Sequence, residues 1–313
     1  MKAFVYVKKA LPDKLVMKEV DKPVPQDHEV LIRVRACAVN AADYRSMKMG
    51  IIPRRRIFGA DIAGRVESAG KGIQRFRTGD LVMGDLSNCG FGGFAEYVVA
   101  PERVLTHKPE EMPFEAAAAL PLAAITALQA MRDKGAIRSG QLVLIVGSSG
   151  GVGTFAIQLA KYFGSVVTAV CSTGNTGQAA TLGADKVIDY KKEDFTRSES
   201  GYDLILAVNG DYSLITYKRL LKPGGIYVMV GGSMRQILKS LTLSKLMSAG
   251  SKKLRTIAAK TNLQDLEFIT ELAAEGHIRP AIDKVYPFEQ TLEAVSYTAQ
   301  GHARGKVVIS HPA

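Results

Sequence analysis

The stretch L-V-L-I-V-G-S-S-G-G-V-G, residues 142–153, decides the fold. Its first five residues form an apolar run of the kind that a buried parallel strand requires, and residues 154–163 continue as an amphipathic helix. Gly147 permits the tight turn between them, Gly150 lets the backbone approach a pyrophosphate, and Gly153 lets the helix pack closely against the strand. Such glycine spacing also occurs in ordinary turns, but here both the strand and the helix are present. The stretch therefore predicts a dinucleotide-binding site.

The chain before this stretch differs from the chain around and after it. Residues 1–110 contain short strand candidates separated by Pro, Gly and Asp turns, at 30–36, 62–68, 80–84 and 95–100. From about Phe114, helices alternate with apolar strands, which we place at 166–170, 186–188, 204–208 and 226–230. A helix over 262–276, a strand over 282–286, a helix over 288–300 and a strand over 306–310 complete the chain. We expect a β-rich region followed by a parallel sheet with crossover helices.

The composition is that of a globular protein, with 47% hydrophobic and 23% charged residues in 313, a length sufficient for two domains. The most apolar stretch, 116–131, is interrupted by Pro121, Thr126 and Gln129, which predicts a buried helix and no membrane span. Residues 1–7 alternate like a strand and lack the features of a signal peptide. We therefore expect a cytoplasmic location.

The cysteines and the charge balance narrow the classes of partner. Cys37, Cys89 and Cys171 are widely spaced, so free thiols are expected rather than a disulfide framework or a structural zinc site. The net charge of +11 could attract nucleic acid or help to collect a phosphorylated cofactor. The densest basic groups, 54–56 and 252–255, lack interleaved aromatic residues, and no nucleic-acid-binding motif occurs. No nucleic-acid partner is expected.

Further motifs extend through nearly the whole chain. They are V-N-A-A-D at 39–43, F-G-A-D-I-A-G at 58–64, G-D-x-V at 79–82, G-G-F-A-E-Y at 92–97, L-P-L-A-A-I-T-A at 120–127, G-A-D-K-V-I-D-Y at 183–190 and G-H-A-R-G-K-V-V at 301–308. Together they resemble the medium-chain dehydrogenase/reductase superfamily, and within it the zinc-free quinone oxidoreductase branch that includes zeta-crystallin and the enone reductases.

The resemblance implies an α/β fold with two domains. A GroES-like β-rich catalytic domain would span residues 1–120 with 280–313, and a Rossmann domain with a doubly wound parallel sheet would span 121–279. Dimers are common in this branch, so a homodimer is the assembly that the resemblance implies.

The positions of the zinc ligands are occupied by other residue types. Zinc-dependent members use a cysteine, a histidine–glutamate pair and a second cysteine, where this chain has Asn40, then Ala60 and Asp61, then Leu122 or Ala123. Alanine and leucine have no lone pair to donate, so no metal is predicted. Without a Lewis acid, reduction of a quinone or a conjugated enone asks less of the protein than alcohol oxidation.

The residues after the second strand of the dinucleotide fold predict NADPH rather than NADH. An NAD-selective fold usually places an acid there, but this chain has C-S-T-G-N at 171–175. Ser172, Thr173 and Asn175 can donate to a 2′-phosphate, or they form a polar turn that leads into a helix. The resemblance places Tyr190 near the adenine ribose, and some relatives carry a lysine in place of Asn175.

Other cofactor contacts are expected from the glycine turn, the carboxyl ends of two later strands and the last motif. The full predicted set is Asn40, Asp43, Thr126, Ser148, Ser149, Gly150, Gly151, Val152, Ser172, Thr173, Asn175, Tyr190, Asn209, Gly210, Gly231, Gly232, Arg304 and Lys306.

The resemblance places Asn40, Asp43 and Thr126 beside the nicotinamide, and we take Asn40, Tyr44 and Thr126 as catalytic candidates. Asn40 could bond a ribose hydroxyl or orient the acceptor carbonyl, whereas alone it would be a turn residue. Asp43 could equally be a helix N-cap, and Thr126 could bond its own helix backbone. Tyr44 is the candidate proton donor or acceptor clamp, or a tyrosine packed where two domains meet.

The sequence thus predicts an NADPH-dependent, zinc-independent reductase that transfers hydride to quinones. One alternative is a reductase of α,β-unsaturated carbonyl compounds. The other is a non-enzymatic structural or regulatory protein that NADPH stabilises by binding.

Overall fold

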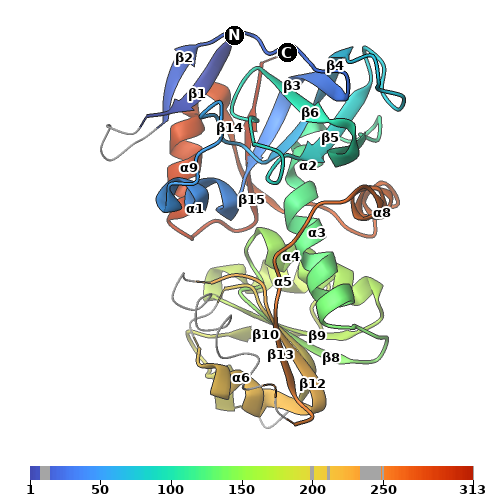
Figure 1. Cartoon of the computed structure of the whole chain (residues 1–313). Helices are drawn as coiled ribbons and strands as arrows, with labels where there is room; N and C mark the ends of the chain where they lie inside the picture. Colours follow the sequence, from blue (N-terminus) through green and yellow to red (C-terminus); the bar gives the residue numbers. More distant parts are fainter. Residues whose placement is uncertain (8–14, 198–200, 210–211, 233–247, 249, 313) are drawn as a thin grey trace. The chain divides into compact units, whose positions relative to one another are not determined.

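Figure 1 shows the computed structural model, which describes residues 1–7, 15–197, 201–209, 212–232, 248 and 250–312. The chain divides into two compact units. Unit 1 consists of Met1–Ile125 together with Lys260–Ala313, and unit 2 consists of Thr126–Ala259.

Unit 2 is built on a six-stranded parallel sheet. Its strands are β8 (Leu142–Val146), β9 (Val166–Cys171), β10 (Lys186–Asp189), β11 (Tyr202–Ala207), β12 (Leu221–Met229) and β13 (Lys253–Thr256). They lie in the order β10-β9-β8-β11-β12-β13, which counted from β8 is the doubly wound order 3-2-1-4-5-6. The helices α4 (Gly151–Tyr162), α5 (Thr176–Thr181) and α6 (Leu214–Leu220) lie between strands in the sequence. The strands form because runs of Val, Ile and Leu can be buried on both faces of a parallel sheet.

Unit 1 is built on a seven-stranded sheet, ordered β14-β15-β3-β4-β5-β7 with β6 also paired to β3. The strands are β3 (Glu29–Val39), β4 (Asp61–Ala69), β5 (Leu81–Asp85), β6 (Tyr97–Pro101), β7 (Leu105–His107), β14 (Ile282–Pro287) and β15 (Lys306–Ser310). The strands β1 (Lys2–Tyr6) and β2 (Leu15–Glu19) form a separate antiparallel pair. The helices are α1 (Ala41–Met49), α2 (Phe114–Ala119), α8 (Leu263–Ala274) and α9 (Thr291–Ala299), with the 3-10 turns η1 (Glu102–Val104) and η5 (Phe288–Gln290).

Strand β3 extends three residues beyond its predicted end at 36. Cys37, Ala38 and Val39 break the alternation of buried and exposed residues because all three are buried. They pair with β15 on one side, and Cys37 and Ala38 also pair with β4 on the other. The extension matters because it delivers the chain to Asn40 at the end of the strand.

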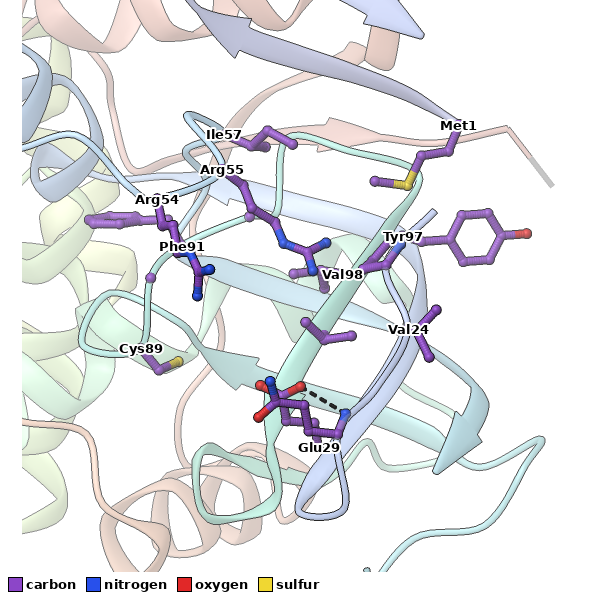
Figure 2. Close-up of a pocket in the computed structure, with 15 residues that line it drawn as sticks. Met1, Val24, Glu29, Arg54, Arg55, Ile57, Cys89, Phe91, Tyr97 and Val98 are labelled. Atoms are coloured by element: carbon purple, nitrogen blue, oxygen red, sulfur yellow. Dashed lines mark hydrogen bonds between the residues drawn. The ribbon is translucent and has the colours of Figure 1, made fainter. Parts of the chain in front are cut away.

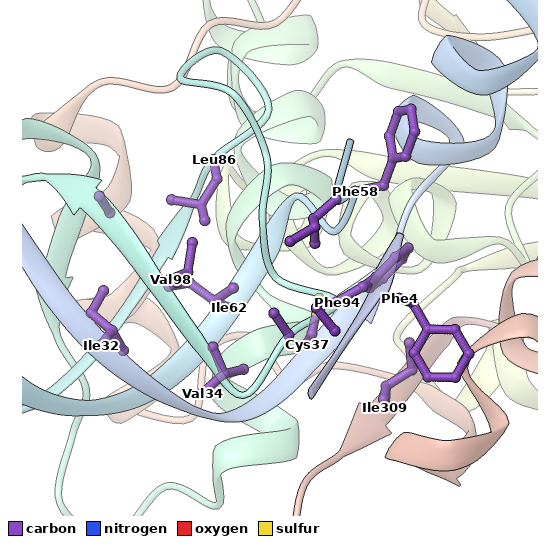
Figure 3. Close-up of a cluster of buried hydrophobic side chains, with 14 of the residues drawn as sticks. Phe4, Ile32, Val34, Cys37, Phe58, Ile62, Leu86, Phe94, Val98 and Ile309 are labelled. Carbon is purple, nitrogen blue, oxygen red and sulfur yellow. The ribbon is translucent and has the colours of Figure 1, made fainter. Parts of the chain in front are cut away.

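The core of unit 1 joins segments from both ends of its sequence (Figure 3). Phe4 contacts Phe288 edge to face, with ring centroids 5.4 Å apart. Ile32, Phe58 and Ile309 are fully buried in the same cluster. These contacts fix β15 beside β3, and β15 carries Lys306.

Two segments that we assigned to the Rossmann domain lie in unit 1. Residues 121–125 begin the helix α3 (Pro121–Gln129), and residues 260–279 include α8. Helix α8 starts where predicted, with Asn262 as its N-cap, but it contacts β7 and η1. The salt bridge between Arg75 and Glu267, 2.7 Å long, also ties it to unit 1. A helix pattern shows that a face is apolar, but not against which sheet that face packs.

One helical segment, Phe114–Lys134, is long and apolar enough by composition to cross a membrane. In its most apolar window, 72% of the residues are buried inside the protein, which is also what a core helix shows. Its length and composition are therefore weak evidence for a span.

Candidate active site

The predicted site residues fall into two groups, one in each unit. In unit 1, Asn40, Asp43 and Lys306 meet with two further carboxylates, Asp61 and Asp85. We call these five residues the buried polar cluster. In unit 2, residues 147–153 form the glycine turn predicted from the sequence.

Asn40 is the N-cap of α1, and its amide group is held from three directions. Its Nδ2 donates to Asp61 Oδ2 at 2.8 Å and to the Ala38 carbonyl at 3.2 Å, while its Oδ1 accepts from Lys306 Nζ at 2.5 Å. Both amide hydrogens are therefore engaged within the protein. With both hydrogens engaged, Asn40 could contact a ribose hydroxyl only by accepting at Oδ1, so its predicted contact with the ribose or the acceptor stays a prediction.

Lys306 and Asp61 form a salt bridge of 3.2 Å in the core of unit 1. Lys306 is 3% exposed and Asp61 is fully buried, so neither charge is stabilised by bulk water. Asp61 also accepts from the Leu122 backbone N–H at 2.9 Å. The ammonium of Lys306 has three donors, and Asn40 and Asp61 use two of them. Lys306 thus positions Asn40 and neutralises Asp61.

Asp43 has a positioning role in this geometry. Its two carboxylate oxygens accept from the backbone N–H groups of Asn40 at 2.8 Å and Gly59 at 2.9 Å. Gly59 has a φ of 100°, and a Cβ there would lie 2.5 Å from the Phe94 nitrogen. The N-cap alternative for Asp43 is wrong, because the N-cap is Asn40. Asp43 instead ties the first turn of α1 to the segment that precedes β4.

Sequence reasoning gave no site role to Asp61, Asp85 or Thr261. Asp85 faces Asp61 across the β4–β5 pair and accepts from the backbone N–H of Ser87 at 2.8 Å and from the hydroxyl groups of Ser87 and Thr261. The available signal was an aspartate at the start of one apolar strand, β4, and another at the end of the next, β5. Strand ends in a core rarely bury a carboxylate unless it is paired or hydrogen-bonded.

Burial determines the protonation of the buried polar cluster. It raises the pKa of Asp43 to about 7 and that of Asp61 to about 6, although Lys306 opposes the increase. Burial also raises the pKa of Asp85, and it raises the pKa of the neighbouring Cys37 thiol well above its usual value. Cys37 therefore stays protonated. The cluster thus holds three carboxylates around one ammonium, and burial raises the pKa of two of the carboxyl groups toward neutral.

Tyr44 and Thr126 are half-buried. Tyr44 lies in α1 and packs against the core of unit 1, and Lys48 Nζ lies 5.6 Å from the centroid of its ring. Thr126 lies in the second half of α3. Their catalytic roles remain predictions.

The positions of the zinc ligands contribute few donor atoms. Ala60 and Ala123 are buried aliphatic side chains, and Leu122 approaches Asp61 through its backbone nitrogen. Across the residues that the structure describes, no three His, Cys, Asp or Glu side chains are grouped as a metal site requires. Asn40 and Asp61, two of the residues at the zinc-ligand positions, hydrogen-bond to each other and to Lys306. The positive charge beside them is therefore the ammonium of Lys306.

In the glycine turn, each glycine meets a different environment. Gly147 has a φ of 82°, and a Cβ there would lie 2.7 Å from the Asn209 backbone. A Cβ on Gly153 would lie 2.3 Å from the Gly147 carbonyl oxygen, so the helix start is packed against the turn. A Cβ on Gly150 would meet nothing within 4 Å. The open side of the turn therefore lies at Gly150, the residue predicted to face a pyrophosphate.

The other residues of the turn approach a ligand mainly through their backbone. The Ser148 hydroxyl is buried and donates to the Val170 carbonyl at 3.0 Å, so it points into the sheet. Ser149, which precedes the N-cap Gly150, is half-buried, as are Gly151 and Val152 in the first turn of α4. The first N–H groups of a helix have no acceptor within the helix and favour an anion. These residues fit the pyrophosphate of a dinucleotide.

The end of β11 meets this turn, and the end of β12 packs in turn on the end of β11. The Asn209 N–H donates to the Val146 carbonyl at 3.2 Å, and the Gly231 N–H donates to the Ala207 carbonyl at 3.3 Å. Gly231 packs on Val208, since a Cβ there would lie 2.6 Å from the Val208 oxygen. Gly232 has a φ of 141°, and Gly210 lies outside the described residues.

After β9, the loop predicted to bind the ribose contains a buried amide with an open acceptor. Asn175 is 9% exposed, its Nδ2 donates to Ser172 Oγ at 3.0 Å, and its Oδ1 has no partner in the described structure. Such an orphaned buried oxygen fits a loop that receives a polar ligand group. Thr173 and Tyr190 are exposed.

Asp189 is an acid that the sequence reasoning overlooked in this loop. It ends β10 in register with Cys171, the residue before Ser172, and its side chain bonds the Thr173 side chain. This bond, together with Lys191 and Lys192, lowers the pKa of Asp189, so it is ionised. Although no acid follows β9 in the sequence, the loop that was predicted to bind the ribose therefore does have a negative charge beside it, on Asp189.

Arg304 is exposed in unit 1, and its backbone N–H donates to Asp283 Oδ2 at 3.0 Å. Its predicted contact with the cofactor stays a prediction. Arg304 and Lys306 were both predicted from the motif at 301–308, and of these two only Lys306 belongs to the buried polar cluster.

Known proteins resemble this chain over most of its length. Two family models match it: the alcohol dehydrogenase GroES-like domain over residues 26–110 and the zinc-binding dehydrogenase over residues 182–309. A chloroplast envelope quinone oxidoreductase homolog of Arabidopsis thaliana is 33% identical over 309 residues, covering 93% of this chain and 92% of that protein. A 2-methylene-furan-3-one reductase of Solanum lycopersicum is also 33% identical and covers 100% of this chain and 79% of its own length.

One more curated protein and one solved structure also resemble this chain over most of its length. A mitochondrial NAD(P)H oxidoreductase of Bos taurus is 33% identical, covering 92% of this chain and 83% of that protein. The solved structure of the quinone oxidoreductase from Coxiella burnetii matches with a TM-score of 0.88 at 28% identity and covers 99% of both chains. The predicted architecture of a GroES-like unit and a Rossmann unit is confirmed.

The predicted cytoplasmic location is wrong. The relatives from Arabidopsis thaliana and Bos taurus are named for the chloroplast envelope and the mitochondrion, and these names contradict the prediction. The sequence reasoning had relied on the absence of a secretory signal, a feature that does not report on organelles.

Proposed function

Because the chain belongs to the quinone oxidoreductase branch of the medium-chain dehydrogenase/reductase superfamily and is an NAD(P)H-dependent oxidoreductase, we propose that it is an NADPH-dependent, zinc-independent reductase of quinones. The observation that carries the proposal is the glycine turn, whose open side at Gly150 is shaped for a dinucleotide, in a chain whose relatives are named quinone oxidoreductases. The homodimer stays a prediction.

The residues of this chain have separate tasks in the proposed reaction. The bound nicotinamide supplies the hydride. The glycine turn holds the pyrophosphate by backbone N–H groups, and the loop 172–175 receives the ribose with its polar side chains. The buried polar cluster fixes Asn40 at the start of α1.

The preference for NADPH is testable at Asp189. Wild-type protein should give a higher kcat/KM with NADPH than with NADH, because the Ser172 hydroxyl, which accepts from Asn175, can donate to a 2′-phosphate. Asp189→Asn should increase that ratio, since it removes a carboxylate that would repel a 2′-phosphate bound at the loop 172–175. Cofactor oxidation at saturating quinone measures both ratios.

Asp133→Asn is the control for this experiment, because Asp133 is an exposed acid of the same unit paired with Arg132. It should leave the ratio unchanged. A wild-type preference for NADH that Asp189→Asn does not shift would contradict the proposed cofactor.

Reduction of α,β-unsaturated carbonyl compounds is the second candidate, favoured by the relative named 2-methylene-furan-3-one reductase. After hydride reaches the β-carbon, the α-carbon needs a proton from a positioned donor. Tyr44→Phe should therefore lower enone turnover about 100-fold and leave NADPH binding unchanged. Steady-state kinetics and NADPH titration measure the two effects.

Tyr286→Phe removes a half-buried hydroxyl from β14 and should change neither turnover nor binding. If enone turnover by Tyr44→Phe matches that of Tyr286→Phe, Tyr44 is not the proton donor. Quinone turnover in the same variants shows which acceptor class depends on Tyr44.

A further inference from the structure

A pocket of about 280 Å³ lies in unit 1, and no predicted site residue lines it (Figure 2). Arg54 and Arg55 extend into it from the turn before β4. Its apolar wall includes Ile57, Phe91 and Val98. An adjoining hollow of about 350 Å³ shares Arg55 and Ile57 with it, so the space continues along the surface.

The turn that carries the two arginines is anchored at both ends. Arg56 has a φ of 60°, its Nε donates to the Tyr6 carbonyl at 2.9 Å, and its own carbonyl accepts from the Tyr6 N–H at 2.7 Å. Pro53 and Ile57 on either side are buried. A non-glycine residue rarely adopts this backbone conformation without compensation from its surroundings. The strained Arg56 thus holds the turn on β1 while its neighbours face the pocket.

The segment 90–92, which also lines the pocket, has positive φ angles as Arg56 does. Gly90, Phe91 and Gly92 have φ values of 105°, 59° and 125°, so three consecutive residues are left-handed. Phe91 lines the pocket, and its ring packs against Phe58 with the two ring centroids 5.4 Å apart. Arg56 and Phe91 are two of the three non-glycine residues with positive φ in the described chain. Backbone strain of this kind gathers at ligand sites.

The charges around the pocket favour an anion. Arg54 and Arg55 are exposed, and no ion pair in the described part of the chain includes either guanidinium. The pocket also contains Glu29, whose Oε2 accepts from the Gln26 N–H at 3.0 Å. Guanidinium groups bind carboxylate and phosphate oxygens in pairs, and the backbone turn that carries these two is held on β1 by Arg56.

Cys89 does not make the pocket a thiol site. Burial, with Asp85 nearby, raises the pKa of Cys89 to about 12, so the thiol stays protonated and unreactive. The useful chemistry of the pocket lies in its arginines and its apolar wall.

We propose that this pocket binds a small organic anion, with its carboxylate or phosphate group on Arg54 and Arg55 and its aryl or alkyl body against Ile57, Phe91 and Val98. None of the residues that line the pocket has a part in the proposed cofactor binding or hydride transfer, and the test does not require turnover.

Calorimetric titration of NADPH-saturated protein with 4-phenylbutyrate tests the proposal, with neutral 4-phenylbutan-1-ol as the uncharged probe. We expect 4-phenylbutyrate to bind with a Kd of about 1 mM or lower and the alcohol to bind at least about tenfold more weakly. The double variant Arg54→Ala/Arg55→Ala should weaken 4-phenylbutyrate binding at least about tenfold. Phe91→Gly, which removes the ring and relieves the strained backbone, should also weaken it.

The matched control is Lys71→Ala/Arg77→Ala, which removes the same charge from two exposed side chains outside the pocket. It should bind 4-phenylbutyrate like wild type. An equal loss of 4-phenylbutyrate affinity in both double variants would show that the effect comes from net charge, and it would overturn the proposed site. Failure of wild type to bind, or equal binding by Arg54→Ala/Arg55→Ala and wild type, would also overturn it.

Discussion

Lys306→Met should lower the free energy of unfolding by about 3–5 kcal/mol, the usual cost of removing one partner from a buried ion pair. The substitution keeps the volume of the side chain but leaves Asp61 fully buried without its counter-ion. It also removes the donor to Asn40 Oδ1, so the amide that begins α1 loses its orientation. Chemical denaturation followed by circular dichroism measures the change.

The pH dependence identifies the cause of the loss. The folded pKa of Asp61 is about 6, above its value of 3.8 in an unfolded chain, so the folded state binds the proton more tightly. Stability contributed by that proton is complete below pH 3.8 and is lost as the pH rises through 6. Without Lys306 the carboxylate is harder still to ionise. The difference between Lys306→Met and wild type should therefore be smaller at pH 5 than at pH 8.

Lys22→Met provides the comparison. It removes an exposed ion pair with Glu67 of 2.7 Å and should cost at most about 1 kcal/mol. The double variant Lys306→Met/Asp61→Leu, which replaces both charges, should recover much of the stability that Lys306→Met loses. A loss in Lys306→Met no larger than that in Lys22→Met would show that the buried pair does not carry the stability that we assign to it.

The parts of the fold that the sequence predicts are those with local signals. The strand β8, the glycine turn and α4 are adjacent in the chain, and the turn needs a φ of 82° that favours glycine. The buried polar cluster has no such signal, because Asn40, Asp61, Asp85 and Lys306 meet only when β15, β3, β4 and β5 pair side by side. The same reason explains Asp189, which reaches the loop at Ser172 through the pairing of β10 with β9.

The role of a side chain depends on which hydrogen-bond partners the fold places around it, and its residue type alone does not reveal those partners. Asn40 was predicted to contact the cofactor or the acceptor, but Lys306, Asp61 and Ala38 use its amide hydrogens and one lone pair. Ser148 likewise turns its hydroxyl to the Val170 carbonyl rather than to a phosphate. In both cases a pairing distant in sequence competes with the ligand contact that the motif suggests.

Gly150→Ala should weaken NADPH binding by at least about tenfold, which is about 1.4 kcal/mol, and should leave the thermal stability of the protein unchanged. Gly150 has a φ of −81°, which alanine adopts without strain, and a Cβ there meets no protein atom within 4 Å. The added methyl group would instead occupy the space where the pyrophosphate approaches the backbone. Titration of NADPH by its fluorescence, beside a thermal melt, measures both properties.

Gly153→Ala should give a different result, because its Cβ would lie 2.3 Å from the Gly147 oxygen and 2.7 Å from Ser148 backbone atoms. Backbone cannot move aside as a flexible side chain can, so the turn and α4 must separate, at a cost of about 1–3 kcal/mol. This variant should melt at a lower temperature than Gly150→Ala. If Gly150→Ala binds NADPH like wild type, the dinucleotide does not approach the turn at Gly150; if the two variants melt alike, the close packing at Gly153 does not stabilise unit 2. The two glycines thus separate the ligand-binding role of the turn from its structural role.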